Sequence, residues 1–300
     1  MDLRSIDARK IGGYVHFSAI LPILICQKSY KLLSDSCCRR EAARFFEKPH
    51  RKFPLLCYNA SMSAQPQASD DPQLTIPPPK LERIYRLLLQ AYGEPEWQPD
   101  GDGLGGLIGT ILSQHTSDIN SGRAYRQLVA VFPTWEQVRD APVERVAEAI
   151  RSGGLANLKA KRIQEVLRVL TERLQDAPLS LNFLAERPLA EGSAYLRSLP
   201  GVGPKTAACV LLFSLVLASF PVDIHVHKVS KRLGLIGAKV SADQAHAISE
   251  SIVPLEYVYI LHVNLIRHGR RVCHAQRPAC ERCPLRLECT YYQALQGERE

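Results

Sequence analysis

The sequence predicts an all-α protein, and three observations support that fold class. Apolar residues recur at helical spacing from about residue 80 onward, no convincing alternating strand is found, and the connections between the expected helices are short. The composition agrees, because 300 residues with 46% hydrophobic residues can bury one large core or two modest ones. The longest apolar run, 210–222, is too short to cross a bilayer and contains Pro221, so no membrane segment is expected.

The expected helices follow one another with few residues between them. One apolar face runs from Leu81 to Tyr92, and Gly93 ends that helix. Thr134 followed by Gln137 predicts a capped start for a short helix. An apolar stripe between Ile163 and Leu174 predicts another. Further helices are expected at 104–113, 118–131, 143–151, 189–197, 204–218, 224–234, 241–252 and 256–268.

The N-terminal segment differs from the rest of the chain. Residues 1–61 show no sustained period and hold 11 Lys/Arg against 5 Asp/Glu. They are followed by 62–79, a segment rich in Ser, Gln, Asp and Pro that is typical of a disordered linker and opens with Met62. We therefore expect 1–61 to be a non-functional extension, or the product of a start assigned too far upstream.

The basic charge is informative only where it is concentrated. The net charge is +8, but residues 62–300 contribute only +2 of it. Between Arg267 and Arg286 there are six arginines and one acid, Glu281. Such a patch could neutralise phosphates or could be an ordinary solvated face, and its composition alone favours neither.

The segment Leu199-Pro-Gly-Val-Gly-Pro-Lys205 joins two expected helices through a turn with two glycines. Gly201 and Gly203 allow positive φ and a close approach of the backbone to a partner. The amides of such a turn, with the start of the next helix, can bind a phosphate oxygen. An ordinary tight helix–helix turn is the commoner explanation of this pattern when it is taken alone.

Lys205 and Asp223 are the two side chains that most suggest chemistry. Lys205 lies in the first turn of a helix, where the helix dipole disfavours a cation and favours the free amine that a nucleophile needs. Asp223 precedes the helix at 224–234 and is a good N-cap. A carboxylate there could also stabilise a cationic transition state, and the two roles are compatible.

Four of the nine cysteines form a cluster near the C-terminus. Their spacing is Cys273-x6-Cys280-x2-Cys283-x5-Cys289, with one CxxC pair rather than the two usual in zinc sites. The spacing favours a [4Fe–4S] cluster and leaves zinc open. Either metal requires a reducing, intracellular (cytoplasmic) environment. Cys209, alone in an apolar stretch, is expected in the core.

The chain resembles the endonuclease III family of helix-hairpin-helix DNA glycosylases. The matching segments are 199–205, 222–225, His268-Gly269 before Cys273 and the complete cysteine spacing; 111–118 and 154–160 match more weakly. The resemblance covers roughly 80–291, and it is specific because these motifs occur together in family order.

The resemblance implies two all-α lobes. A six-helix barrel would occupy 97–217 and contain the helix-hairpin-helix, and an iron–sulfur lobe would combine 80–96 with 218–291, leaving 292–300 as a tail. The partner would be double-stranded DNA carrying damaged bases or abasic sites. The protein would bind it as a monomer, and no association with a membrane is expected. Gly201, Val202 and Gly203 would contact DNA on one side and Arg277 of the cysteine loop on the other.

The resemblance also implies a chemical mechanism. The damaged base would be flipped out of the duplex, Lys205 would attack the sugar C1′, and Asp223 would activate the nucleophile or stabilise the charge on the sugar. β-Elimination from the imine would then cut the strand. The implied function is a bifunctional glycosylase and abasic-site lyase acting on oxidised pyrimidines, with a mainly structural [4Fe–4S] cluster on the four cysteines.

Two positions differ from the family pattern. Where the family commonly has a glutamine that fills the space of the flipped base, this chain has His115, preceded by Gln114. Leu155 matches the family's intercalating residue, but Ala156 replaces the aromatic residue that often follows. Leu155 could instead pack at a helix end. The substrate preference therefore stays open.

Two other functions remain possible. One is a mismatch-directed glycosylase without lyase chemistry, although relatives of that kind lack the lysine found here at Lys205. The other is a non-catalytic DNA-binding module, which would not need Lys205 together with Asp223.

Overall fold

A computed structural model describes residues 78–97, 99, 101–175 and 177–297, and in these residues every regular element is a helix. The predicted all-α fold class is confirmed. The predicted extension at 1–61 lies outside the described residues, as does nearly all of the predicted linker at 62–79. No helix in the described part of the chain is long and apolar enough to cross a membrane.

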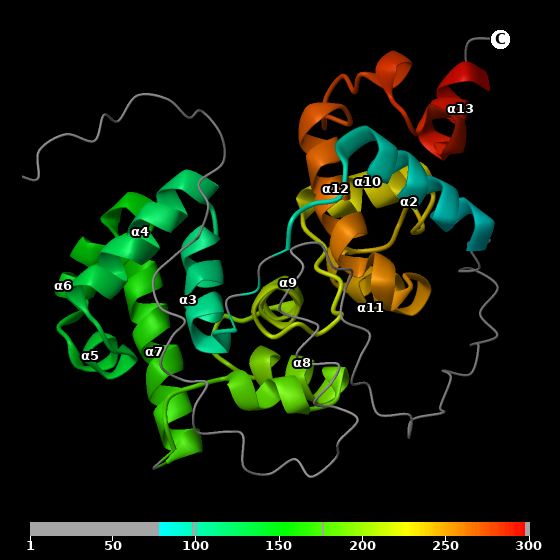
Figure 1. The fold of residues 1–300 in the computed structure, drawn as a ribbon. Coiled ribbons are helices and arrows are strands. Elements are labelled where there is room, and N and C mark those ends of the chain that lie inside the picture. The colour runs from blue at the N-terminus through cyan, green and yellow to red at the C-terminus, as the bar shows by residue number, and fades with distance from the viewer. Residues whose placement is uncertain (1–77, 98, 100, 176, 298–300) are drawn as a thin grey trace, which may run out of the picture. The chain divides into compact units, whose positions relative to one another are not determined.

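The first group of helices is continuous in sequence and encloses one hydrophobic core. That core is lined by fully buried side chains such as Leu107, Ile111, Ile163 and Leu211. Figure 1 shows the long helix α7 running past α4, α5 and α6. The elements of this group are α3 (Gly103–Ser113), α4 (Asp118–Val131), α5 (Trp135–Asp140), α6 (Val143–Ala149), η1 (Arg151–Gly153), α7 (Ala156–Leu174), η2 (Asn182–Glu186), α8 (Leu189–Arg197), α9 (Pro204–Cys209) and η3 (Val210–Ser214).

The second group combines the first described helix with the C-terminal third of the chain. Helix α12 packs against both α2 and α10, and Figure 1 shows α2 beside α12. Its core includes Ile84, Val229 and Leu265, which are almost fully buried. The elements are α2 (Pro78–Tyr92), α10 (Ile224–Leu233), α11 (Ala242–Ile252), η4 (Leu255–Tyr257), α12 (Val258–Arg271), η5 (Cys280–Arg282), η6 (Arg286–Glu288) and α13 (Thr290–Gly297).

Side-chain caps set several of the helix starts. Asp102 caps α3, Ser117 caps α4 and Thr134 caps α5, and each side chain accepts a hydrogen bond from an N–H in the first turn of its helix. The cap at Thr134 was predicted from the sequence. Ser241 and Gln244 form a complete capping box at α11. These caps fix where the loops that carry candidate site residues end.

Two segments differ from the sequence prediction. The helix expected over 204–218 keeps α-helical bonding only to Cys209, continues as a π-helix over Val210–Ser214, and ends before Val216, which has φ +62°. The chain thus leaves the helix four residues earlier than expected, and the return to α10 is correspondingly longer. The segment expected to be a C-terminal tail contains most of helix α13.

Candidate active site and metal centre

The turn between α8 and α9 buries its apolar side chains and exposes its glycines. Leu199 and Val202 are 3% and 6% exposed. Gly201 has φ +68°, and a Cβ there would collide with the Arg162 side chain, so this position requires glycine. Gly203 differs from the expectation of positive φ: its backbone is extended, with φ −92°. A Cβ at Gly203 would meet nothing within 4 Å, so it leaves open space in front of α9.

Lys205 lies half buried in the first turn of α9. Its ammonium group acts electrostatically on the thiol of Cys209, one helical turn later. Burial raises the pKa of the Cys209 thiol, the nearby Lys205 charge lowers it, and the charge of Asp223 raises it. Cys209 is buried, as its sequence context predicted, but it is also close enough to a candidate catalytic side chain for the two charges to interact, which the sequence did not indicate.

Asp223 is the N-cap of α10, as its position in the sequence predicted. Its Oδ1 accepts hydrogen bonds from the N–H of His225 at 2.9 Å and of Val226 at 2.7 Å. The next side chain, Ile224, is 80% exposed. The carboxylate is thus held by the backbone beside an open surface.

His262 of α12 connects Lys205 and Asp223 electrostatically. It is 2% exposed, and its Nδ1 lies 2.9 Å from the carbonyl oxygen of Pro221. Burial lowers the pKa of His262 to about 4, the Asp223 charge opposes that shift, and the Lys205 charge adds to it. Lys205 and Asp223 therefore both act on Cys209 and on His262, and the fold brings the two candidates into one neighbourhood. Sequence reasoning missed His262, because a single histidine in an apolar helix is usually a core residue.

In the loop after α3, the neighbouring residues Gln114 and His115 have different environments. Gln114 is held inside: its Oε1 accepts from Arg162 at 3.2 Å, and its Nε2 donates to Thr206 Oγ1 at 3.4 Å. His115 is exposed and has φ +54°, a backbone conformation that residues other than glycine rarely adopt. His115 is the side chain of this pair that is free to meet a partner.

Leu155 occupies the N-cap of α7 in a left-handed conformation, with φ +49°. It follows Gly154, whose φ is +67°. Its side chain is 53% exposed, as is that of Leu158 one turn later. An exposed leucine at this position gains little from packing at the helix end.

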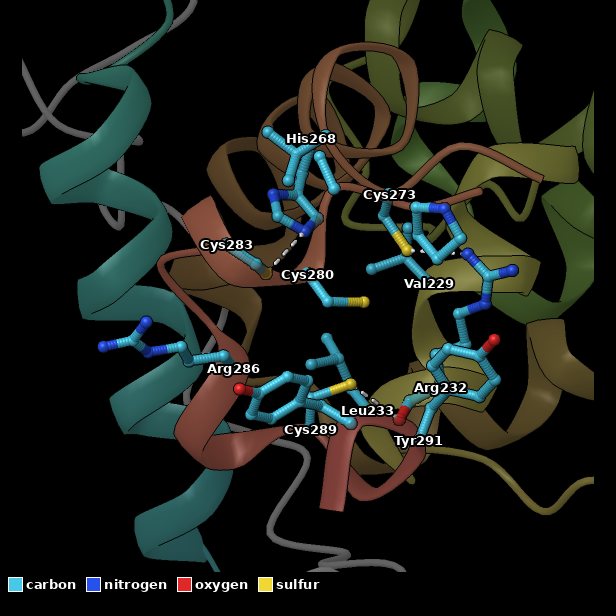
Figure 2. Close-up of a pocket in the computed structure, with 14 residues that line it drawn as sticks. Val229, Arg232, Leu233, His268, Cys273, Cys280, Cys283, Arg286, Cys289 and Tyr291 are labelled. Atoms are coloured by element: carbon cyan, nitrogen blue, oxygen red, sulfur yellow. Dashed lines mark hydrogen bonds between the residues drawn. The ribbon is translucent and has the colours of Figure 1, made fainter. Parts of the chain in front are cut away.

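The four clustered cysteines line one pocket in the second group of helices. Figure 2 shows their side chains arranged around a common space, with Cys280 pointing into its middle. Arg232 of α10 closes one side, donating from Nη1 to Cys273 Sγ at 3.2 Å and to the carbonyl of His274 at 2.7 Å. The thiol of Cys289 donates to the carbonyl of Arg232 at 3.2 Å. The pocket is therefore built jointly by α10 and the cysteine loop.

The four cysteines place four sulfur donors in one pocket, and this donor set suits a metal centre. Around one zinc ion, with Zn–S bonds of about 2.3 Å, tetrahedral thiolates lie roughly 3.8 Å apart. Within the residues that the structure describes, no three His, Cys, Asp or Glu side chains are grouped closely enough to hold one ion. Burial raises the pKa of Cys283 to about 11 and also raises the pKa values of Cys280 and Cys289. Four thiolates in this pocket therefore require a cationic centre.

The basic patch is only partly available to a partner. Arg277 is exposed and has φ +49°. Arg270 lies 3.3 Å from the carboxylate of Asp118 at the start of α4, and Arg282 donates to the carbonyl of Arg271 at 3.4 Å. Arg277 lies in the loop between Cys273 and Cys280, and its exposed side chain is available for a contact outside the protein.

Comparison with known proteins gives the same family as the motifs. Residues 108–255 match the family model described as HhH-GPD superfamily base excision DNA repair protein. Endonuclease III of Thermotoga maritima is 31% identical over 213 residues, which cover 71% of this chain and 93% of the relative. A protein named as a DNA glycosylase in Arabidopsis thaliana is 38% identical over 168 residues, and the match spans only 56% of that protein.

Solved structures agree with this assignment. A trapped covalent endonuclease III–DNA intermediate and a non-covalent endonuclease III–DNA complex each superpose with a TM-score of 0.62 at 27% identity, covering 74% and 75% of this chain and all of theirs. A thermostable thymine-DNA glycosylase shares the fold, with a TM-score of 0.60 at 21% identity. The chain belongs to the endonuclease III family of base excision DNA repair glycosylases.

Proposed function

We propose that this chain is a bifunctional enzyme that removes oxidised pyrimidines from duplex DNA and cleaves the strand at the resulting abasic site. The observation that carries the proposal is the shared neighbourhood of Lys205 and Asp223, which both interact with Cys209 and His262. An amine and a carboxylate in one neighbourhood are the two groups that imine-forming base excision needs.

The approach to DNA uses the exposed parts of the first helix group. The turn at Gly201–Gly203 would bind a backbone phosphate through its amides. A base inside the duplex cannot be reached, so the damaged nucleotide must rotate out of the stack. His115 would occupy the space it leaves, and Leu155 would wedge into the opposite strand; the exposure of both side chains supports these roles.

The chemistry follows from the amine and the carboxylate. The free amine of Lys205 attacks the sugar C1′, the glycosidic bond breaks, and the base leaves with the bonding electrons. The carboxylate of Asp223 accepts the proton that the amine loses, or offsets the positive charge that develops on the sugar. The sugar ring then opens to an imine on Lys205, and loss of a C2′ proton expels the 3′ phosphate. Hydrolysis of the imine regenerates the amine.

A [4Fe–4S] cluster on Cys273, Cys280, Cys283 and Cys289 completes the proposal. Bound by these thiolates, it would supply a structural cross-link and take no part in making or breaking bonds. The loop that it fixes would present Arg277 to a phosphate. A charged contact of this kind adds about one unit to the slope of log affinity against log salt concentration.

Borohydride trapping on abasic duplex DNA tests the lysine assignment. The wild-type protein and Lys161→Gln, a control in which an exposed lysine of α7 is replaced, should each form a covalent complex with DNA. Lys205→Gln should form none and should not cut the strand, while still binding abasic DNA. If Lys205→Gln is still trapped, another amine is the nucleophile.

The same assay distinguishes the alternative functions. Excision of a base without trapping by the wild-type protein would indicate a glycosylase that uses water, as a mismatch-directed enzyme would. DNA binding with neither excision nor trapping would indicate a non-catalytic module. Duplexes containing thymine glycol, or thymine opposite guanine, test the choice of substrate.

A further inference from the structure

Lys159 is a buried cation within the first group of helices. It lies on α7, is 3% exposed, and its Nζ is 2.7 Å from the carbonyl oxygen of Leu112 and 2.7 Å from that of Gly153. Burial lowers the pKa of its amine. Burying a lysine is costly unless its donors are satisfied, and these two carbonyls satisfy two of its three N–H groups.

The two carbonyls belong to the two loops that carry the proposed DNA-inserting residues. Leu112 lies three residues before His115, and Gly153 lies two residues before Leu155. His115 and Leu155 have φ values of +54° and +49°. Strained residues of this kind persist only when their surroundings fix them, so each loop requires an external support.

We propose that Lys159 is a positioning residue for base flipping. Its single ammonium group would tie together the two loops, so that His115 and Leu155 keep the spacing needed to enter the DNA at the same time. The inference rests on the proposed function, and it names a residue of that site which contacts neither DNA nor the reacting atoms.

Neighbouring contacts support the same role for this face of α7. A Cβ on Gly153 would lie 3.1 Å from Ala124 Cβ and 3.9 Å from the Leu112 carbonyl oxygen, so the loops approach closely where the ammonium bridges them. Three residues after Lys159, Arg162 donates to Gln114, the residue before His115. Helix α7 thus holds the His115 loop from two points.

The test compares Lys159→Met with Lys161→Met in the full chain. Lys161 is exposed on the same helix, which makes it the matched control. Lys159→Met should slow single-turnover excision from a thymine glycol duplex by about 10- to 100-fold, because misplacing an inserted group by about 1 Å has effects of that size. Cleavage of a duplex with a pre-formed abasic site should slow less than about threefold, because an unpaired nucleotide is less costly to extrude.

A double-mutant comparison distinguishes positioning from general destabilisation. In a Leu155→Ala background, adding Lys159→Met should slow excision by a smaller factor than it does alone, because the part of its effect that acts through Leu155 is already lost and only the part through His115 remains. Equal losses on both substrates, or losses that multiply in the double variant, would overturn the proposal. So would rates for Lys159→Met that match those of Lys161→Met.

Two further arms keep the result interpretable. If Lys159→Met is not folded by circular dichroism, Lys159→Gln is assayed on the same two duplexes, and the loss must again be larger on the thymine glycol duplex. Equal losses, or no loss, would overturn the proposal. If the wild-type protein excises no base although it is folded, the proposed function itself fails, and this outcome is distinct from those that concern Lys159.

Discussion

Replacing Asp223 with asparagine or with alanine separates its capping role from its proposed chemical role. The side chain accepts hydrogen bonds from two N–H groups of α10, at 2.9 and 2.7 Å. Alanine removes both and should lower the free energy of unfolding by about 1–2 kcal/mol, which for a domain of this size lowers Tm by roughly 2–8 °C. Asparagine caps almost as well as aspartate, so it should lose at most about 1 kcal/mol, the contribution of the charge near the helix dipole.

The rate of base excision should not follow this order of stability. Both variants lack the negative charge near the sugar, so both should excise a damaged base about 100- to 1,000-fold more slowly, with DNA affinity largely kept. Thermal melts by circular dichroism and single-turnover excision on one thymine glycol duplex give the two quantities. An Asp223→Asn variant that is stable and fully active would falsify the electrostatic role and leave only the cap.

Four other predictions follow from the described geometry. Gly201→Ala should lower Tm by a few degrees and weaken binding to abasic duplex in fluorescence anisotropy, because a non-glycine residue at φ +68° is strained and its Cβ displaces Arg162; Gly203→Ala, with open space, is the control and should leave Tm unchanged. Because burial lowers the pKa of His262 from 6.5 to about 4, the unfolded chain binds a proton that the native state excludes between these values. His262 should therefore account for up to about 3 kcal/mol of the stability lost at the acid end of that window, with His268 and His246, whose pKa values burial also lowers, adding to the loss. In urea titrations His262→Gln should have a shallower pH slope than the wild-type protein, and an unchanged slope would assign the effect to other groups. Cys283→Ser, purified anaerobically, should lose iron and sulfide relative to the wild-type protein, whereas stoichiometric zinc in the wild type would refute the cluster. Leu155→Ala should slow base excision much more than cleavage at pre-formed abasic sites, and equal effects would count against the wedge.

The sequence predicted the helices best where local rules decide the structure. Side-chain caps such as Thr134 and Asp223 act within three residues, so their partners could be read directly from the chain. The π-helix after Cys209 could not be predicted in this way. The apolar residues around it form a continuous run, and such a run is equally compatible with an uninterrupted α-helix. Packing between the helices decides where that run stops being helical.

The candidate site was predictable in its motifs but not in its supports. Lys205 and the four cysteines lie in dense local patterns that the sequence displays. His262 and Lys159 were not singled out by the motifs on their helices, and their importance arises from contacts with carbonyl groups at Pro221, Leu112 and Gly153. These contacts join positions 41, 47 and 6 residues apart, and a single sequence carries no record of them.

The pairing of α2 with α12 affects the order in which the protein can assemble during synthesis. Helix α2 ends at Tyr92 and its partner begins at Val258, with the whole first group of helices encoded between them. At roughly 5–20 residues per second, a ribosome needs about ten seconds or more to make that interval. Throughout this time the apolar face of α2 lacks α12 on the nascent chain, and the segment carrying Lys205 is complete before α12 begins. The group of helices that contains the cysteine pocket is therefore the last to be completed.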